Sequence, residues 1–145
     1  MLKKACNLLL KSENQSSKVR KVHVLKNLQM FIGSCHCKKV RFQIETESVY
    51  EDLYRCNCSL CRKKSIVMKP VSQEFFTLLE GNENLGLYKW NKNIAEHFFC
   101  KLCGVYTHHK RRRYPNQIAI NFACLDDFDL PEATRICLVD GASHD

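Results

Sequence analysis

Three cysteines fall within six residues of the sequence, at Cys56, Cys58 and Cys61. In an extended segment, residues two apart point to the same side, so Cys56 and Cys58 can present both sulfurs to one ion. Ser59 fits the capping position of a short helix that carries Cys61 in its first turn. Three protein ligands with a vacant fourth position are typical of catalytic zinc, and an outside thiol entering that position would be ionised. The motif therefore predicts a catalytic zinc site.

Three positive side chains, Arg62, Lys63 and Lys64, follow this motif directly. Together with the N-terminus of the expected helix, they would lower the pKa values of the neighbouring thiols. The alternative is a fourth protein ligand, which would close the shell and make this a second structural site. The histidines that could supply that ligand are His97, His108 and His109.

A second group of cysteines has the spacing of a closed metal site. Cys35 and Cys37 form a C-x-C pair, and Cys100 and Cys103 form a C-x-x-C pair. Gly104 supplies the backbone freedom that a tight turn after the second pair needs. Four thiolates complete a tetrahedral shell around zinc, at about 2.3 Å per zinc–sulfur bond. The sequence therefore predicts two zinc ions per chain, one structural and one catalytic.

The cysteine motifs lie among many short strand patterns. Residues 38–46 alternate apolar and polar side chains, which is typical of a half-buried strand. Further short strands are expected at 65–70, 76–81, 85–90, 95–100, 116–123 and 134–141. Brief helices are expected only at 58–64 and 71–76, so we predict a mainly β domain. Trp90 is expected in its core, with a pocket wall as the alternative.

The positive charge is concentrated at the N-terminus. Residues 1–30 carry seven basic side chains and one acidic side chain, whereas the other 115 residues carry 16 basic and 14 acidic ones. We predict a basic, flexible extension over residues 1–29 and one zinc-binding domain over residues 30–145. Because that domain is nearly neutral, nucleic acid binding is disfavoured, and residues 1–29 are the segment through which it would occur.

The sequence contains no candidate membrane segment. No apolar stretch approaches the roughly 18 residues of a membrane span, and the early cluster ACNLLL is shorter than the core of a signal peptide. We therefore expect a cytoplasmic protein without a membrane partner. In a reducing compartment, closely spaced cysteines hold metal or react more often than they form disulfides.

Five segments together resemble the glutathione-dependent formaldehyde-activating enzyme family, which includes centromere protein V. These segments are GSCHCKKVRF, RCNCSLCRKK, FFCKLCGVYTHH, YPNQIAINFACLD and VDGASHD, within residues 31–145. The resemblance implies a compact, zinc-stabilised, tent-like fold of short antiparallel strands with very little helix. It also implies structural zinc ligands at Cys35, Cys37, Cys100 and Cys103, and catalytic ones at Cys56, Cys58 and Cys61.

The function that follows from this resemblance is that of a zinc-dependent carbon–sulfur lyase, similar to S-(hydroxymethyl)glutathione synthase. A low-molecular-weight thiol, with glutathione as the candidate, would be activated at the three-cysteine zinc site and would attack an aldehyde such as formaldehyde. Because glutathione carries two carboxylates, Arg62, Lys63 and Lys64 are candidates to bind it. The run from Lys110 to Arg113 is a second candidate, with a solvated loop as its other interpretation.

Two other functions remain open from the sequence. A non-catalytic zinc module would contact nucleic acid or protein through the basic segment 1–29, with affinity falling steeply in salt. Reduction of methionine sulfoxide would instead need a redox cysteine outside the zinc sites, for which Cys6, Cys124 and Cys137 remain. Buried structural thiols are the expected state of the last two. The sequence predicts no oligomeric state.

Overall fold

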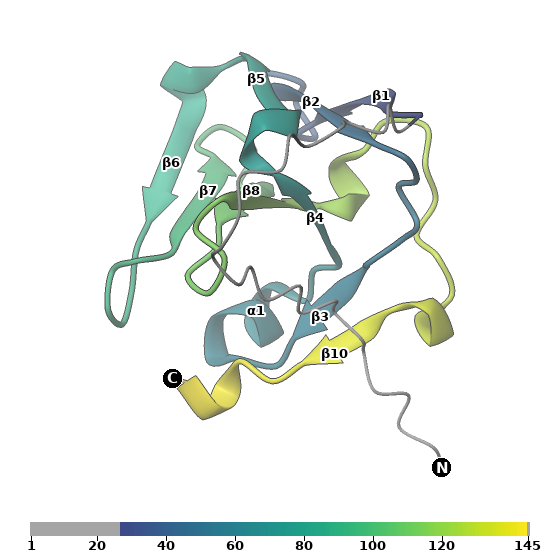
Figure 1. The fold of residues 1–145 in the computed structure, drawn as a ribbon. Coiled ribbons are helices and arrows are strands. Elements are labelled where there is room, and N and C mark those ends of the chain that lie inside the picture. Colours follow the sequence, from purple (N-terminus) through teal and green to yellow (C-terminus); the bar gives the residue numbers. More distant parts are fainter. Residues whose placement is uncertain (1–26, 145) are drawn as a thin grey trace, which may run out of the picture.

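The computed structural model describes residues 27–144 and contains ten β-strands and one α-helix (Figure 1). The strands are β1 (Gln29–Ser34), β2 (Arg41–Thr46), β3 (Tyr54–Cys56), β4 (Met68–Ser72), β5 (Phe76–Glu80), β6 (Leu85–Tyr88), β7 (Glu96–Cys100), β8 (Tyr106–Lys110), β9 (Gln117–Asn121) and β10 (Cys137–Val139). The helix is α1 (Ser59–Lys64). The predicted mainly β fold with very little helix is therefore confirmed.

The strands form two sheets. A three-stranded sheet has the order β1-β2-β5, and a seven-stranded sheet has the order β10-β3-β4-β9-β8-β7-β6. All neighbouring strands are antiparallel except β10 and β3, which are parallel. In Figure 1 the three-stranded sheet lies at the top, whereas α1, β3 and β10 lie together at the bottom. The segment after β1, which carries Cys35 and Cys37, and the segment from β3 to α1, which carries Cys56, Cys58 and Cys61, therefore lie at opposite ends of this view.

The main core lies where the two sheets face each other. The alternation predicted for residues 38–46 is confirmed, because Val40, Phe42 and Ile44 are fully buried. Phe42 stacks on Phe76 with ring centroids 5.7 Å apart, and Phe122 of the turn after β9 completes the cluster. Burying a large apolar side chain stabilises a fold by about 1.5–3 kcal/mol. This core fixes the two ends of the fold relative to each other.

Three strands were not expected from the sequence, namely β1, β3 and β8. The hydrophobic pattern missed β8 because its residues are mostly polar, although the four from Tyr106 to His109 are buried. β8 lies between β7 and β9, and its position in the sheet, rather than its own composition, buries it. This strand carries two of the histidines considered below.

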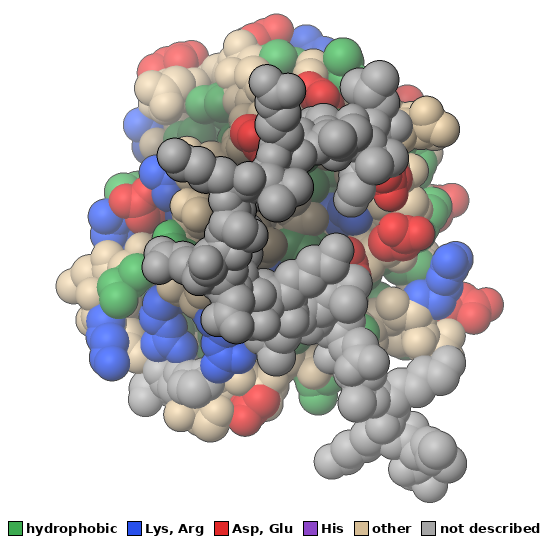
Figure 2. All heavy atoms as spheres, viewed as in Figure 1, with side chains coloured by type: hydrophobic (Ala, Val, Ile, Leu, Met, Phe, Trp, Pro, Cys, Tyr) green, Lys and Arg blue, Asp and Glu red, His purple; other side chains and the backbone are tan. Residues whose placement is uncertain are grey.

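The predicted N-terminal extension falls largely outside the described residues. β1 begins at Gln29, next to the predicted domain start at Met30, whereas residues 1–26 are not described. Between residues 27 and 144, no helix is long and apolar enough to cross a membrane. Figure 2 shows acidic and basic side chains around the rim of one face, with basic ones gathered at the lower left. This mixture agrees with the nearly balanced charge of residues 31–145, which carry 16 basic and 14 acidic side chains.

Candidate metal centres and the adjoining cavities

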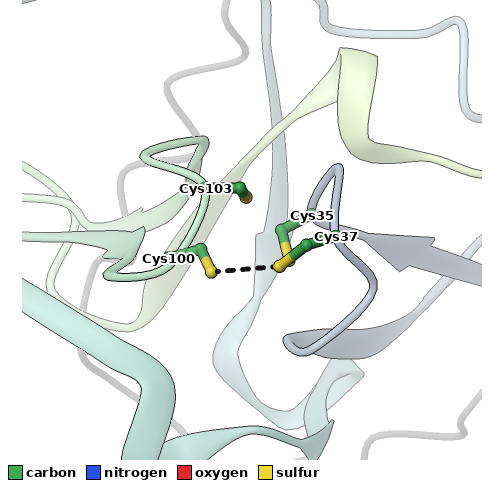
Figure 3. A group of neighbouring side chains, drawn as sticks. All are labelled: Cys35, Cys37, Cys100 and Cys103. Atoms are coloured by element: carbon green, nitrogen blue, oxygen red, sulfur yellow. Dashed lines mark hydrogen bonds between the residues drawn. The ribbon is translucent and has the colours of Figure 1, made fainter.

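The sulfurs of Cys35, Cys37, Cys100 and Cys103 converge at one point between the β1–β2 turn and the turn after β7 (Figure 3). All four lie within 4.8 Å of one another. The Sγ of Cys37 is 3.6 Å from that of Cys35 and 3.7 Å from that of Cys100. A tetrahedron with zinc–sulfur bonds of about 2.3 Å has edges of about 3.8 Å. The sulfur spacing therefore fits a single zinc ion.

Two tight turns place these sulfurs. The backbone N–H of Cys35 donates to the carbonyl of Val40 over 3.0 Å. That of Cys100 donates to the carbonyl of Val105 over 2.9 Å. Gly104 completes the second turn with a φ of 75°, a conformation that favours glycine, so its predicted role is confirmed. Cys35 and Cys100 are almost completely buried, whereas Cys37 and Cys103 are partly exposed, so the cluster lies at the edge of the interior.

The thiol pKa values differ between Cys103 and Cys37 of this cluster. Burial opposes the charged form of Cys103, but backbone hydrogen bonds from Cys37 and Val105 outweigh it and lower the pKa to about 6. At Cys37 a backbone hydrogen bond from Lys39 lowers the pKa, but burial and the neighbouring sulfurs raise it to about 11. Four thiolates therefore need a compensating cation, which a metal ion would provide.

The trio of Cys56, Cys58 and Cys61 also converges, with all three sulfurs within 4.8 Å of one another. The backbone N–H of Cys58 approaches the Cys56 sulfur at 3.5 Å. The prediction that Ser59 caps the helix is wrong. Cys58 is the capping residue, because its sulfur accepts a hydrogen bond from the Cys61 backbone N–H at 3.4 Å, and Ser59 is the first helical residue. The helix cap and the candidate ligand are therefore the same side chain.

Burial and crowding hold protons on this trio. Burial is the main cause that raises the pKa of Cys58. The side-chain hydrogen bond with Cys56, followed by burial, raises that of Cys61 strongly. Three thiolates at this spacing would repel one another in a site of low polarity, unless a cation lies between them. The donor set therefore fits a soft divalent metal such as zinc.

A clamp from the C-terminal segment supports the trio. The side-chain Oδ1 of Asn57 accepts hydrogen bonds from the backbone N–H groups of Gly141 and Ala142, each over 2.8 Å. Its Nδ2 donates to Asp140 Oδ1 over 3.0 Å. A Cβ added to Gly141 would collide with the Cys56 sulfur and would lie 3.1 Å from Cys58 Cβ. Only glycine therefore lets this backbone pass so close to the sulfurs.

A cavity of about 130 Å³ opens beside the trio, and all three cysteines line it. The other wall residues that matter here are Trp90, His97, His109 and Arg112. Sites for drug-sized ligands usually have volumes of about 300–1,000 Å³. This cavity therefore admits small reacting groups rather than a whole tripeptide. Trp90 takes the pocket position that the sequence left as an alternative.

A second cavity, also of about 130 Å³, adjoins the first and shares Cys56 and Cys61 with it. The arginines at positions 111, 112 and 113 line it, as do Tyr54 and Asp140. Burial raises the pKa of Tyr54 despite the guanidinium of Arg111, which lies 4.9 Å from its ring. A strongly basic wall therefore adjoins the trio.

The basic residues of α1 lie differently from this arginine wall. Arg62 and Lys63 are exposed, and neither they nor Lys64 line either cavity. The Lys64 ammonium instead lies 4.8 Å from the ring centre of Tyr106. A carboxylate-binding role for these three residues stays a prediction, and the structure offers the arginine wall as the nearer candidate.

None of the three candidate histidines joins the sulfur trio within the described part of the chain, because the group within 4.8 Å contains only cysteines. His97 and His109 line the cavity next to it, whereas His108 packs on Phe98 with ring centroids 4.6 Å apart. Burial lowers the pKa of His97 to about 4 and that of His109 well below 6.5. Both imidazoles are therefore neutral near pH 7.

The remaining cysteines lie outside the two candidate metal clusters. Cys124 is 4% exposed, and its Sγ donates to the carbonyl of Tyr106 over 3.5 Å. Burial raises its pKa to about 12, which suppresses the reactive thiolate. Cys137 lies in β10, is half-buried and is disulfide-bonded, so the expectation of a buried free thiol at this position is wrong. Cys6 lies outside the described residues. Cys124 thus has the buried structural environment expected from its sequence context.

The fold and the two clusters define a small, mainly β protein that could hold two metal ions at unlike sites. The chain matches the model of the family "Glutathione-dependent formaldehyde-activating enzyme" over residues 30–137. A Halomonas elongata protein provisionally named a glutathione-dependent formaldehyde-activating enzyme is 29% identical over 107 residues, which cover 68% of this chain and 67% of that protein. The crystal structure of a Rhodobacter sphaeroides protein is 32% identical in sequence and superposes with a TM-score of 0.70. The match covers 74% of this chain and 99% of the Rhodobacter chain. The chain therefore belongs to the glutathione-dependent formaldehyde-activating enzyme family.

Proposed function

We propose that this protein is a zinc-dependent carbon–sulfur lyase that joins a low-molecular-weight thiol to an aldehyde. S-(hydroxymethyl)glutathione synthase is the activity it would resemble, with glutathione and formaldehyde as substrates. The observation that carries this proposal is the three-sulfur group of Cys56, Cys58 and Cys61, which lines a cavity. The three sulfurs lie within 4.8 Å of one another, and among residues 27–144 no fourth ligand atom joins them at that distance. Family membership supports the same substrate pair.

Two zinc ions with different roles fit the two clusters. Cys35, Cys37, Cys100 and Cys103 would enclose a structural zinc completely, since four sulfurs saturate a tetrahedral ion. The trio would hold the second zinc. When bound there, that ion would keep an incoming thiol ionised near pH 7.

The proposed reaction is an addition that balances without a further reagent. The thiol loses its proton to solvent, its sulfur forms a bond to the carbonyl carbon, and the C=O π electrons move to oxygen. The oxygen then takes one proton from solvent, so that one thiol and one aldehyde give one hemithioacetal, which for formaldehyde is the S-hydroxymethyl adduct. The reverse reaction breaks the carbon–sulfur bond. The cavity walls, including Trp90 and His97, would hold the reacting atoms together and limit water.

The arginine wall would orient the thiol substrate. Glutathione carries two carboxylates, and Arg112 lines both the cavity at the trio and the second cavity, where Arg111 and Arg113 also lie. Guanidinium groups bind carboxylates through paired hydrogen bonds. The small first cavity would then receive the thiol end of the tripeptide and the aldehyde, while the charged ends would extend along the second.

The decisive experiment follows the addition directly. Purified zinc-loaded protein is mixed with glutathione and formaldehyde at low concentration, and adduct formation is compared with the spontaneous rate. We expect acceleration by the native chain and none by Cys58→Ser. Cys124→Ser is the matched control, because this buried cysteine lies outside both clusters, and it should keep the activity. Equal rates with and without the native protein would contradict the proposal.

A further inference from the structure

Two histidines in the wall of the first cavity each have a ring nitrogen without a partner. His97 is 5% exposed and His109 is 8% exposed, yet both line the cavity beside the cysteine trio. Within the described residues, His97 Nε2 and His109 Nδ1 are buried and accept or donate no hydrogen bond. Since an unpaired buried polar atom costs free energy, each of these nitrogens calls for a partner such as water, an ion or a ligand.

The pairing of β7 and β8 places these two histidines side by side. His97 and His109 are direct partners in the antiparallel ladder, and their rings stack with centroids 5.2 Å apart at an interplanar angle of 25°. Side chains alternate along a strand, so the adjacent His108 turns to the other face, where it packs on Phe98 and Phe76. The sheet therefore presents two of these three imidazoles to the cavity.

A tyrosine hydroxyl pairs with one of these histidines. Tyr106 Oη lies 2.8 Å from His97 Nδ1. Burial raises the pKa of Tyr106 well above 10, so the hydroxyl stays protonated and can donate a hydrogen bond to Nδ1. When Tyr106 donates to Nδ1, the ring proton of His97 lies on Nε2, and this nitrogen is a hydrogen-bond donor in a residue that lines the cavity. His109, neutral in the same surroundings, supplies the second nitrogen.

These nitrogens are free to bind something other than a metal ion. The group of ligand atoms around the trio, taken over residues 27–144, contains the three sulfurs and neither histidine nitrogen. A neutral imidazole pair has little affinity for a carboxylate compared with the nearby arginines, but it suits an uncharged oxygen. A carbonyl oxygen accepts hydrogen bonds, and a hydroxyl both accepts and donates.

We propose that His97 Nε2 and His109 Nδ1 bind the aldehyde oxygen and, after addition, the hydroxyl of the adduct. The inference rests on the proposed function and names the side chains that hold the electrophile. As the sulfur–carbon bond forms, negative charge develops on this oxygen, and the Nε2–H group donates to it. The proton that the oxygen finally takes comes from solvent, so neither histidine changes its net protonation. Donors placed where charge develops act more strongly in the transition state than in the ground state.

Kinetics provide the first test. His97→Phe and His109→Phe keep an aromatic ring in place but remove the nitrogens. We expect kcat/KM for the aldehyde to fall about 100-fold, the usual effect of losing one such donor, with KM for the thiol nearly unchanged. Tyr106→Phe should shift the same parameter in the same direction. His108→Phe is the matched control, because this imidazole packs away from the cavity, and it should behave as wild type.

Ligand binding provides a second test that does not require turnover. The zinc-loaded full chain, labelled with ¹⁵N in its histidines, is titrated with S-(hydroxymethyl)glutathione and with S-ethylglutathione, which has a methyl group in place of the hydroxyl. We expect the ¹⁵N signals of His97 Nε2 and His109 Nδ1 to move with the first ligand only. In His109→Phe the preference for the hydroxyl ligand should shrink, while binding of S-ethylglutathione stays the same.

The two tests separate this inference from the proposed function. A native chain that does not accelerate the addition contradicts the proposed function, and the ¹⁵N titration then still decides whether the histidines bind the oxygen. A native chain that is active, with unchanged kinetics in both phenylalanine variants and no hydroxyl-dependent ¹⁵N shift, overturns the inference and leaves the proposed function standing.

Discussion

Asn57 and Gly141 lie 84 residues apart in sequence, and the Asn57 side-chain oxygen accepts the Gly141 backbone N–H over 2.8 Å. Asn57 stands between two candidate zinc ligands, Cys56 and Cys58, and Gly141 passes within van der Waals distance of both. The C-terminal segment therefore forms one wall of the site. The geometry of the trio depends on a contact that joins distant parts of the chain.

Enlarging Gly141 should damage the trio selectively. In Gly141→Ala the new methyl group would meet the Cys56 sulfur, so the trio or the C-terminal segment has to move. We expect zinc content to fall from two ions toward one per chain while the far-ultraviolet circular dichroism spectrum stays native. Ala142→Ser, an exposed neighbour, is the control. Full zinc content in Gly141→Ala would show that the close contact has no role in metal binding.

Removal of the Asn57 side chain should loosen the same wall. Asn57→Ala leaves the N–H groups of Gly141 and Ala142 and the Asp140 carboxylate without this partner. Each lost hydrogen bond costs about 0.5–1.5 kcal/mol, so the zinc affinity of the trio should decrease at least tenfold. Competition with a chromogenic chelator measures this decrease. An unchanged affinity would mean that the clamp is dispensable.

The two cysteine clusters should respond differently to the loss of one sulfur. Cys100 is fully buried, and structural zinc binding is coupled to folding, so Cys100→Ser should unfold the domain or lower its melting temperature strongly. Cys58→Ser should retain one zinc ion and most of the stability. Metal analysis and thermal melts measure both effects. If Cys100→Ser melted like wild type, the assigned division of roles would be wrong.

The stability of the fold should depend on pH through His108. Burial lowers its pKa from 6.5 to about 3 in the folded state. Between these values the unfolded chain binds a proton that the folded chain does not bind. The free energy of unfolding therefore has its highest value above pH 6.5, as far as His108 is concerned, and decreases as the pH falls toward 3. His108→Phe should reduce this slope by up to about 1.4 kcal/mol per pH unit.

Denaturation at several pH values measures the slope for wild type and variant. Phe76→Leu is the control, because it disturbs a ring that contacts His108 without removing a titrating group. It should lower the stability equally at every pH. Parallel curves for wild type and His108→Phe would contradict the expected role of His108.

Deleting residues 1–29 distinguishes catalysis from a binding function of the basic segment. The predicted boundary at Met30 lies in β1, next to its first residue Gln29. Under the proposed function, adduct formation should survive the deletion. Under the non-catalytic alternative, salt-sensitive binding to nucleic acid should collapse. Loss of both properties in a folded protein would mean that residues 1–29 contribute to the site itself.

Local spacing predicted the metal clusters better than it predicted their surroundings. The i, i+2 and i, i+3 spacings of the cysteines determine which sulfurs can meet, and such short-range geometry can be read from the sequence. The same reasoning placed the helix cap at Ser59, because hydroxyl groups usually cap helices, whereas Cys58 holds this position with its sulfur. A group of candidate metal ligands can thus displace an ordinary local preference.

The walls of the cavity could not be predicted, because they depend on strand register. Whether His97 and His109 share a face depends on the pairing of β7 with β8, which includes an irregularity between Phe98 and Phe99. A shift of one residue would turn each side chain to the opposite face. The approach of Gly141 is similarly a property of the whole fold, since β10 must first pair with β3.

The two clusters need different lengths of the chain. The four-cysteine cluster has all its sulfurs once residue 103 is present, whereas the trio, whose last cysteine is Cys61, gains its wall only from Gly141 and Ala142. A chain truncated before Gly141 would therefore keep every sulfur of both clusters but lose one wall of the trio. Under the proposed function, the C-terminal segment would help to decide which molecules reach the trio.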